Sequence, residues 1–150
     1  MFRFHREKNA DATVAAIEVP IGQASHFGVV TVDNDYRITG FEEKPDHPSS
    51  IPGRPDMAFA SMGVYLFNRA KIVEHLHSDA LQDTSHDFGR NIIPEMMTSS
   101  KVCAYNFIDE NRKAAKYWRD VGTLDAYWEA NMDLISVDPL LNLYDHAWPI

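Results

Sequence analysis

Apolar and polar positions follow one another along the chain in blocks of strand-like and helix-like spacing. Residues 13–20 form a nearly continuous apolar run, which is typical of a strand buried on both faces of a sheet. Residues 2–9 precede this run and have the pattern of the last turns of a helix. Because a helix followed by a buried strand is typical of α/β folds, we expect an α/β domain.

The next block, residues 27–43, predicts a β-hairpin. Two strand-like runs flank the segment 33–35, which reads Asp-Asn-Asp. These residue types favour turns, because their side chains bond the nearby backbone and because they tolerate left-handed conformations. The second strand should end at Pro45, which has no N–H to donate to a neighbouring strand. A proline-rich surface loop is expected at 46–56.

The remaining chain continues to alternate between helix and strand patterns. A helix expected at 69–77 places Ile72, Val73 and Leu76 on one face. Two further helices are expected, one at 90–98 with a break at Pro94 and one at 124–136 after an N-cap at Thr123. Three further strands are expected at 58–67, 102–107 and 117–122.

Composition and charge narrow the class of protein. A length of 150 residues with 45% hydrophobic and 24% charged residues suits a single globular domain. The formal net charge of -8 argues against a broad nucleic-acid surface. Cys103 is the only cysteine, so a reducing, cytoplasmic setting is expected. No apolar run approaches the length that spans a bilayer, and we expect no membrane partner.

Glu43 and Lys44 lie at the end of the expected hairpin, where an open α/β sheet presents side chains to a ligand. An ammonium group neutralises a phosphate, and a carboxylate accepts hydrogen bonds from sugar hydroxyls. The alternative is a surface ion pair, which contributes about 0 to 1 kcal/mol. Gly28 either permits close approach of a ligand or marks a bulge. Ser61 is either a ligand contact or a small polar residue in a strand.

Asp120 ends an aromatic segment that precedes a helix start. Magnesium binds one or two carboxylates together with substrate phosphates, so one such aspartate can form half of a metal site. The alternative is that Asp120 pairs with Arg119 or caps the following helix. His75 and His77 are two residues apart on an expected helix and do not share a face, which argues against a two-histidine metal site.

Several short segments together resemble glucose-1-phosphate adenylyltransferase, the ADP-glucose pyrophosphorylase of the bacterial glycogen pathway. The Glu-Lys-Pro at 43–45 is shared by many sugar-nucleotide pyrophosphorylases. The Ser-His-Asp-Phe-Gly at 85–89 and the Tyr-Trp-Arg-Asp-Val-Gly-Thr at 117–123 match the adenylyl branch more narrowly. The tail through Trp148-Pro149-Ile150 is similar too, so the resemblance covers essentially the whole chain. The other matching segments are 25–29, 41–45 and 60–65.

The resemblance implies the reaction of ATP with α-D-glucose 1-phosphate to give ADP-glucose and diphosphate, with Mg²⁺ as cofactor. Lys44 would hold the phosphate of glucose 1-phosphate, and Glu43 and Ser61 would bind the sugar. Gly28 would bring the backbone close to the same ligand. Asp120 would be one of two aspartates that hold magnesium. Catalysis would rest on positioning and charge neutralisation, with Lys44 and Asp120 as the catalytic residues.

A fold is implied as well: the C-terminal part of a Rossmann-like, GT-A-like nucleotidyltransferase domain, in which a mixed sheet is flanked by helices. Members of this family begin with a glycine-rich loop that grips the ATP triphosphate, and they end in a left-handed β-helix. Residues 1–150 contain no such loop pattern. We therefore expect residues 1–150 to be the sugar-phosphate-binding half of the domain, a fragment that is inactive alone.

Two alternatives stay open beside the adenylyltransferase. One is another sugar-1-phosphate nucleotidyltransferase that uses a different base. The other is a non-catalytic regulatory subunit of the same fold, which the joint presence of Lys44 and Asp120 disfavours. The resemblance further implies a cytoplasmic protein that binds glucose 1-phosphate and ATP and forms a homotetramer at full length.

Overall fold

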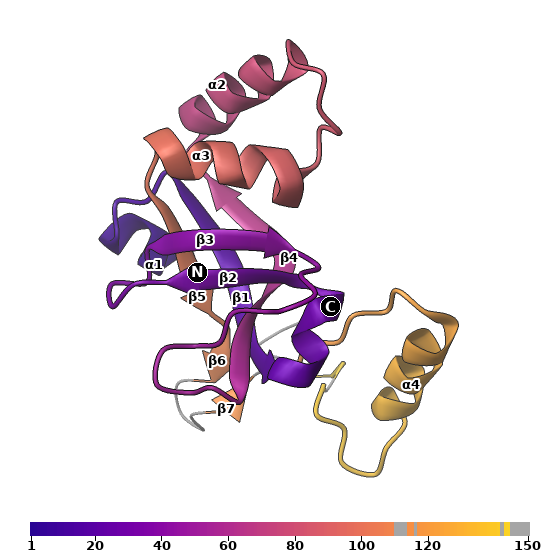
Figure 1. Ribbon diagram of the computed structural model, residues 1–150. Coiled ribbons are helices and arrows are strands. Elements are labelled where there is room, and N and C mark those ends of the chain that lie inside the picture. Colours follow the sequence, from indigo (N-terminus) through magenta and orange to yellow (C-terminus); the bar gives the residue numbers. More distant parts are fainter. Residues whose placement is uncertain (110–113, 116, 142, 145–150) are drawn as a thin grey trace. The chain divides into compact units, whose positions relative to one another are not determined.

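The computed structural model describes residues 1–109, 114–115, 117–141 and 143–144. The chain divides into two units, Met1–Ile108 and Asp109–Ile150, and each is described by itself. The first unit contains a five-stranded sheet in the order β3-β2-β4-β1-β5 (Figure 1). Its strands are β1 (Ala12–Pro20), β2 (Gly28–Val32), β3 (Ile38–Glu43), β4 (Met57–Phe67) and β5 (Val102–Asn106).

The sheet is mixed. Strand β1 pairs in parallel with β5 and antiparallel with β4, and β2 pairs antiparallel with β3 and β4. The expected hairpin at 27–43 is therefore confirmed as β2 and β3. Every residue of β1 is buried except Glu18 and Pro20, as expected for a strand covered on both faces. The predicted α/β fold with a mixed sheet and flanking helices is confirmed.

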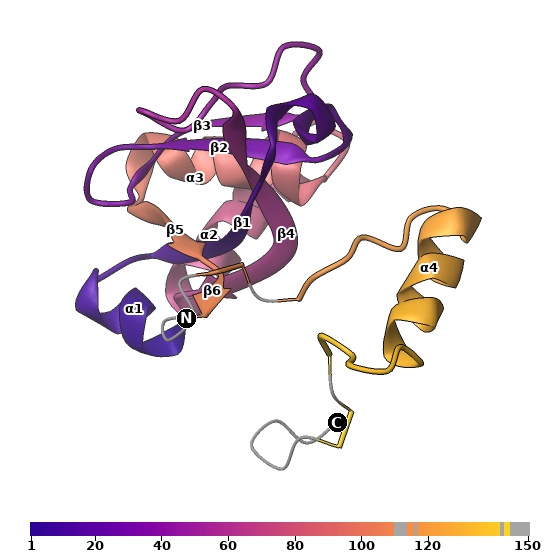
Figure 2. The ribbon, with the colours of Figure 1, turned by 90° about the horizontal axis from the view of Figure 1, so that it is seen from below.

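Helices cover both faces of this sheet. Helix α3 (Ile93–Ser99) packs on one face, where Ile93 and Met96 meet Val14 and Val30 in the main hydrophobic cluster. Helix α1 (Phe2–Glu7) lies on the other side of β5 (Figure 2). Its Phe4 ring packs edge-on against Tyr105. Since neighbouring strand residues point to opposite faces, the two helices bury alternate residues of the same strands.

The remaining helical elements of this unit are α2 (Arg69–Ala80), the 3₁₀ helix η1 (Ile21–His26) and the π-helical turn η2 (Phe88–Ile92). Turn η2 leads directly into α3, and Pro94 stands in the first turn of α3, where proline costs no intrahelical hydrogen bond. The predicted break at Pro94 is confirmed. Asp87 caps η2, because its carboxylate accepts a hydrogen bond from the N–H of Arg90.

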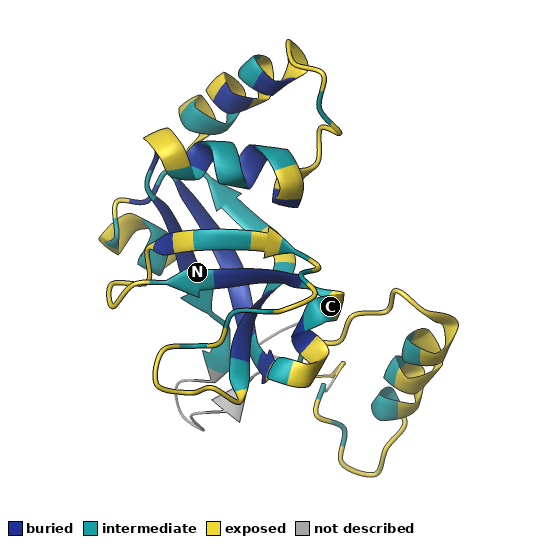
Figure 3. Cartoon of the chain, viewed as in Figure 1, coloured by how far each residue is buried: buried dark blue, intermediate teal, exposed yellow. Residues whose placement is uncertain are grey.

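The apolar face of α2 is covered only in part, at Ile72, which packs against the main hydrophobic cluster. Val73 and Leu76 are 45% and 42% exposed, whereas His75 and Asp79 are the buried residues of this helix. The reason is that both polar groups find partners: the His75 ring lies 3.2 Å from the Ser100 hydroxyl, and Asp79 accepts hydrogen bonds. Figure 3 shows the contrast between the dark, buried β1 and the largely exposed outer side of α2.

The second unit contains α4 (Leu124–Leu134), and the Thr123 hydroxyl accepts a hydrogen bond from Ala126 N–H as its predicted N-cap. Two short strands, β6 (Ile108–Asp109) and β7 (Ala114–Ala115), pair with each other near its start. The strand expected at 117–122 is wrong. Side chains hold that segment instead, because Tyr117 and Arg119 both contact the Asp133 carboxylate of α4.

Some expectations fall on residues that the structure does not describe. The family-like ending Trp148-Pro149-Ile150 lies outside the described residues. Among the residues that are described, no helix has the length and apolar character needed to cross a membrane.

Candidate functional site

Three of the predicted site residues fall in one row across the sheet. Gly28 on β2 pairs with Glu43 on β3. Val29 pairs with Ala60 on β4, so the next position along this antiparallel pair sets Gly28 beside Ser61. Side chains at one level of neighbouring strands share a face of the sheet. The register thus brings Gly28, Glu43 and Ser61 together.

A β-bulge next to Ser61 shapes the end of this row. Val14 pairs with Tyr65 and Ala16 pairs with Ser61, so three residues of β4 stand opposite one residue of β1. Gly63 lies inside the bulge with a φ of +68°, a conformation that favours glycine. Bulges are frequent next to active sites, where they redirect side chains. Here the bulge sets the spacing between the Ser61 hydroxyl and the Tyr65 ring.

Two glycines make room for the Glu43 carboxylate. A Cβ atom at Gly28 would lie 2.8 Å from Glu43 Oε2 and 3.0 Å from the Phe41 ring. A Cβ atom at Gly89 would also lie 2.8 Å from Glu43 Oε2. The carboxylate therefore rests against the backbone of β2 on one side and against turn η2 on the other. It connects the sheet row with the segment that begins at Asp87.

Tyr65 and Phe88 complete the site. Their rings stack with centroids 5.6 Å apart and an interplanar angle of 19°, which holds turn η2 over the end of β4. Burial raises the pKa of the Tyr65 phenol, a hydrogen bond with Ser61 lowers it, and the negative charges of Glu43 and Asp87 raise it. The net shift is upward, so Tyr65 stays neutral and can donate a hydrogen bond at neutral pH.

Lys44 follows Glu43 in an unusual backbone conformation. Its φ is +50°, a left-handed value that is uncommon for residues other than glycine. Its N–H donates to the Phe27 carbonyl at a distance of 3.0 Å, and its side chain is exposed. Strained backbone of this kind costs about 1–3 kcal/mol and is frequent at ligand sites. The exposed Lys44 thus directly follows the carboxylate that lies in the row.

Reasoning from the sequence assigned no ligand role to three residues that the fold adds to this cluster: Tyr65, Asp87 and Gly89. Asp87 caps η2, and its charge also acts on Tyr65. Ser61 and Tyr65 are an even number of positions apart in one strand, so their side chains are expected on the same face of the sheet. This spacing could have indicated Tyr65 from the sequence. The contact of Gly89 with Glu43 is long-range and had no local signal.

Asp120 belongs to the second unit and is exposed. The alternative roles for Asp120 were an ion pair with Arg119 and a cap of the following helix. Arg119 instead binds the carboxylates of Glu129 and Asp133, and Thr123 caps α4. Among the described residues, no three His, Cys, Asp or Glu side chains gather to hold a metal ion. Asp120 therefore fits a magnesium ion only as a single carboxylate, with substrate oxygens as further ligands.

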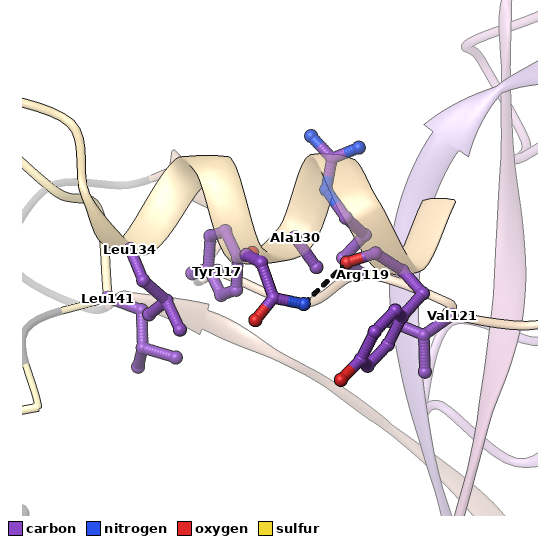
Figure 4. Close-up of a pocket in the computed structure, with 8 residues that line it drawn as sticks. Tyr117, Arg119, Val121, Ala130, Leu134 and Leu141 are labelled. Atoms are coloured by element: carbon purple, nitrogen blue, oxygen red, sulfur yellow. Dashed lines mark hydrogen bonds between the residues drawn. The ribbon is translucent and has the colours of Figure 1, made fainter. Parts of the chain in front are cut away.

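An open hollow of about 310 Å³ lies beside α4 within the second unit (Figure 4). Its lining is mainly apolar and includes Tyr117, Leu134 and Leu141. It contains none of the predicted site residues, and the Arg119 guanidinium at its wall is neutralised by two carboxylates. We therefore place the candidate site at the row of Gly28, Glu43 and Ser61.

The contact between Gly28 and Glu43 predicts the effect of Gly28→Ala. The added methyl group collides with the carboxylate and with Phe41, so the variant should lose about 1 kcal/mol or more of stability in denaturant unfolding. Gly22→Ala is the control, because nothing lies within 4 Å of a Cβ at Gly22. The cost of Gly28→Ala should shrink in a Glu43→Ala background. An equal cost in both backgrounds would contradict the contact.

Comparison with known proteins identifies the family of this chain. The family model described as "Nucleotidyl transferase" matches residues 1–137. Relatives named glucose-1-phosphate adenylyltransferase align with the whole chain: the protein of Rhodopirellula baltica is 54% identical over 151 residues, and that of Paramagnetospirillum magneticum is 52% identical over 155 residues. The chain spans about a third of the length of these curated relatives, 34% and 36% respectively. The chain belongs to the nucleotidyl transferase family.

Proposed function

We propose that this chain supplies the glucose 1-phosphate site of a glucose-1-phosphate adenylyltransferase. The observation that carries the proposal is the row of Glu43, Gly28 and Ser61, with the exposed Lys44 next to Glu43 in the chain. The names of relatives that are 52–54% identical to the chain support this choice of reaction. The full protein would join ATP and α-D-glucose 1-phosphate to give ADP-glucose and diphosphate, a step of glycogen synthesis.

The inner part of the row suits a sugar. Carboxylates accept hydrogen bonds from hydroxyl groups, and Glu43 and Asp87 both act on the same tyrosine. The Ser61 hydroxyl and the neutral Tyr65 phenol can donate as well as accept. The missing side chain at Gly28 leaves room for the Glu43 carboxylate to lie close to the sheet, where it can accept hydrogen bonds from a sugar.

The exposed Lys44 beside the row suits a phosphate. Lys44 is a compact cation, and its neighbour Glu43 faces the glycines rather than pairing with it as a simple surface ion pair. In the reaction, a phosphate oxygen of glucose 1-phosphate forms a bond to the α-phosphorus of ATP while the bond from that phosphorus to diphosphate breaks. Lys44 would hold the attacking phosphate in place and reduce its repulsion from the triphosphate.

Magnesium is part of this proposal. The ion, when bound, would neutralise charge on the phosphate oxygens. From this chain, Asp120 would contribute one carboxylate to it. The cytoplasmic location and the homotetramer that the family resemblance implies stay predictions.

The phosphate role of Lys44 can be tested in a hybrid enzyme, in which residues 1–150 replace the matching segment of the Rhodopirellula baltica relative. Lys44→Ala should raise KM for glucose 1-phosphate by about ten- to a hundredfold, because a charge-assisted hydrogen bond is lost. KM for ATP should change little. Lys71→Ala is the matched control, since Lys71 is bound to Glu74 on the surface of α2.

The outcomes of that experiment separate the candidate functions. An equal rise of KM for both substrates would contradict the phosphate role of Lys44. A hybrid that uses another sugar 1-phosphate better than glucose 1-phosphate would favour a related sugar-1-phosphate nucleotidyltransferase. Binding without any turnover would favour a regulatory subunit.

The metal role of Asp120 predicts a different kinetic signature. In the same hybrid, Asp120→Asn should lower kcat by about tenfold or more and raise the magnesium concentration needed for half-maximal rate. Asp138→Asn, an exposed carboxylate beyond α4, should leave both quantities nearly unchanged. Full activity of Asp120→Asn at low magnesium would remove Asp120 from the metal site.

A further inference from the structure

A buried carboxylate on α2 holds the segment that carries Asp87. The Asp79 side chain is 5% exposed, although an aspartate is rarely buried without partners. Its Oδ1 atom accepts a hydrogen bond from the Thr84 hydroxyl at 2.7 Å. Its Oδ2 atom lies 2.6 Å from Nδ1 of His86, so this ring nitrogen carries the proton. One carboxylate thus binds both ends of the turn 84–86.

This turn sets the direction of the chain into the ligand site. His86 has a φ of +54°, which is costly for a histidine unless its surroundings enforce it. The His86 N–H also donates to the Thr84 hydroxyl at 3.1 Å. The next residue is Asp87, and two positions further the backbone of Gly89 contacts the Glu43 carboxylate. Any release of His86 would therefore move Asp87 and Gly89 relative to the sheet.

We propose that Asp79 and His86 are positioning residues, which hold Asp87 and Gly89 against Glu43 so that both carboxylates face the same ligand. This inference rests on the proposed function, because it assigns the ligand of that site to glucose 1-phosphate. Asp79 is not one of the apolar residues of α2, and its role in holding the turn 84–86 explains why it is buried. The hydrogen bond from His86 is also the largest of the causes that hold the pKa of the Asp79 carboxyl below its ordinary value.

The kinetic test uses the hybrid enzyme described above. Asp79→Ala and His86→Gly should each raise KM for glucose 1-phosphate by about tenfold, with kcat and KM for ATP changing little. Glycine is chosen at position 86 because it accepts the left-handed backbone while removing the ring. The two effects should not add in the double variant, because each substitution removes the same hydrogen bond between Asp79 and His86. His77→Ala, an exposed histidine of the same helix, is the control.

A rescue separates positioning from folding. Asp79→Asn should restore most of the affinity, because the amide oxygen still accepts from Thr84 and the amide N–H can donate to the other tautomer of His86. Additive effects of Asp79→Ala and His86→Gly, or a KM for glucose 1-phosphate that neither change alters, would overturn the proposal.

NMR of the 150-residue chain, with and without Asp79→Ala, gives a second readout that does not depend on catalysis. The ring ¹⁵N shifts of His86 should report a protonated Nδ1, and Asp79→Ala should shift the amide signals of Asp87 and Gly89. Unchanged amides in a folded variant would overturn the positioning role. If these shifts appear while the unsubstituted hybrid fails to bind glucose 1-phosphate, the positioning stands and the proposed ligand is wrong.

Discussion

The site depends on the absence of a side chain at two glycines. Gly28 in β2 and Gly89 in η2 both face the Glu43 carboxylate, and a methyl group at either place would come within 2.8 Å of its Oε2 atom. A carboxylate confined in this way loses little further conformational freedom when it binds a ligand, which favours tight binding. Sheet register and turn geometry act together here, because the two glycines come from segments far apart in the chain.

The surrounding structure supports this arrangement from two sides. On the same face of the sheet as the row, α3 and the strands share a close-packed cluster that includes Val14, Ile93 and Met96. Beside the row, two residues are held in left-handed conformations, Lys44 and His86. Each directly precedes or follows a carboxylate of the site, so the backbone strain lies where ligand contacts are expected.

Local rules were enough to predict most of the fold. Continuous apolar residues predicted β1, Asp and Asn predicted the turn of the hairpin, and Pro94 predicted the break between η2 and α3. These features depend on near neighbours in the sequence. They also placed Glu43 and Lys44 at a strand end, and register then brought Gly28 and Ser61 beside them.

The wrong or missing predictions have one physical origin, which is contact with residues that are distant in the sequence. Hydrophobic spacing could not reveal that Ser100 and Thr84 make the burial of polar groups on α2 favourable. The expected strand at 117–122 was lost to side-chain bonds with α4. Tyr65 and Asp87 joined the site only through a bulge and a capped turn. Such long-range terms do not appear in a local pattern.

The central claim is that Glu43, its two glycines and Lys44 form one binding site for glucose 1-phosphate. The most direct measurement is an NMR titration of the 150-residue chain with α-D-glucose 1-phosphate, with glucose and inorganic phosphate as separate references. We expect shifts at Gly28, Glu43, Lys44, Ser61 and Gly89, with phosphate alone affecting mainly Lys44. Shifts confined to other parts of the chain, or none at saturating ligand, would contradict it.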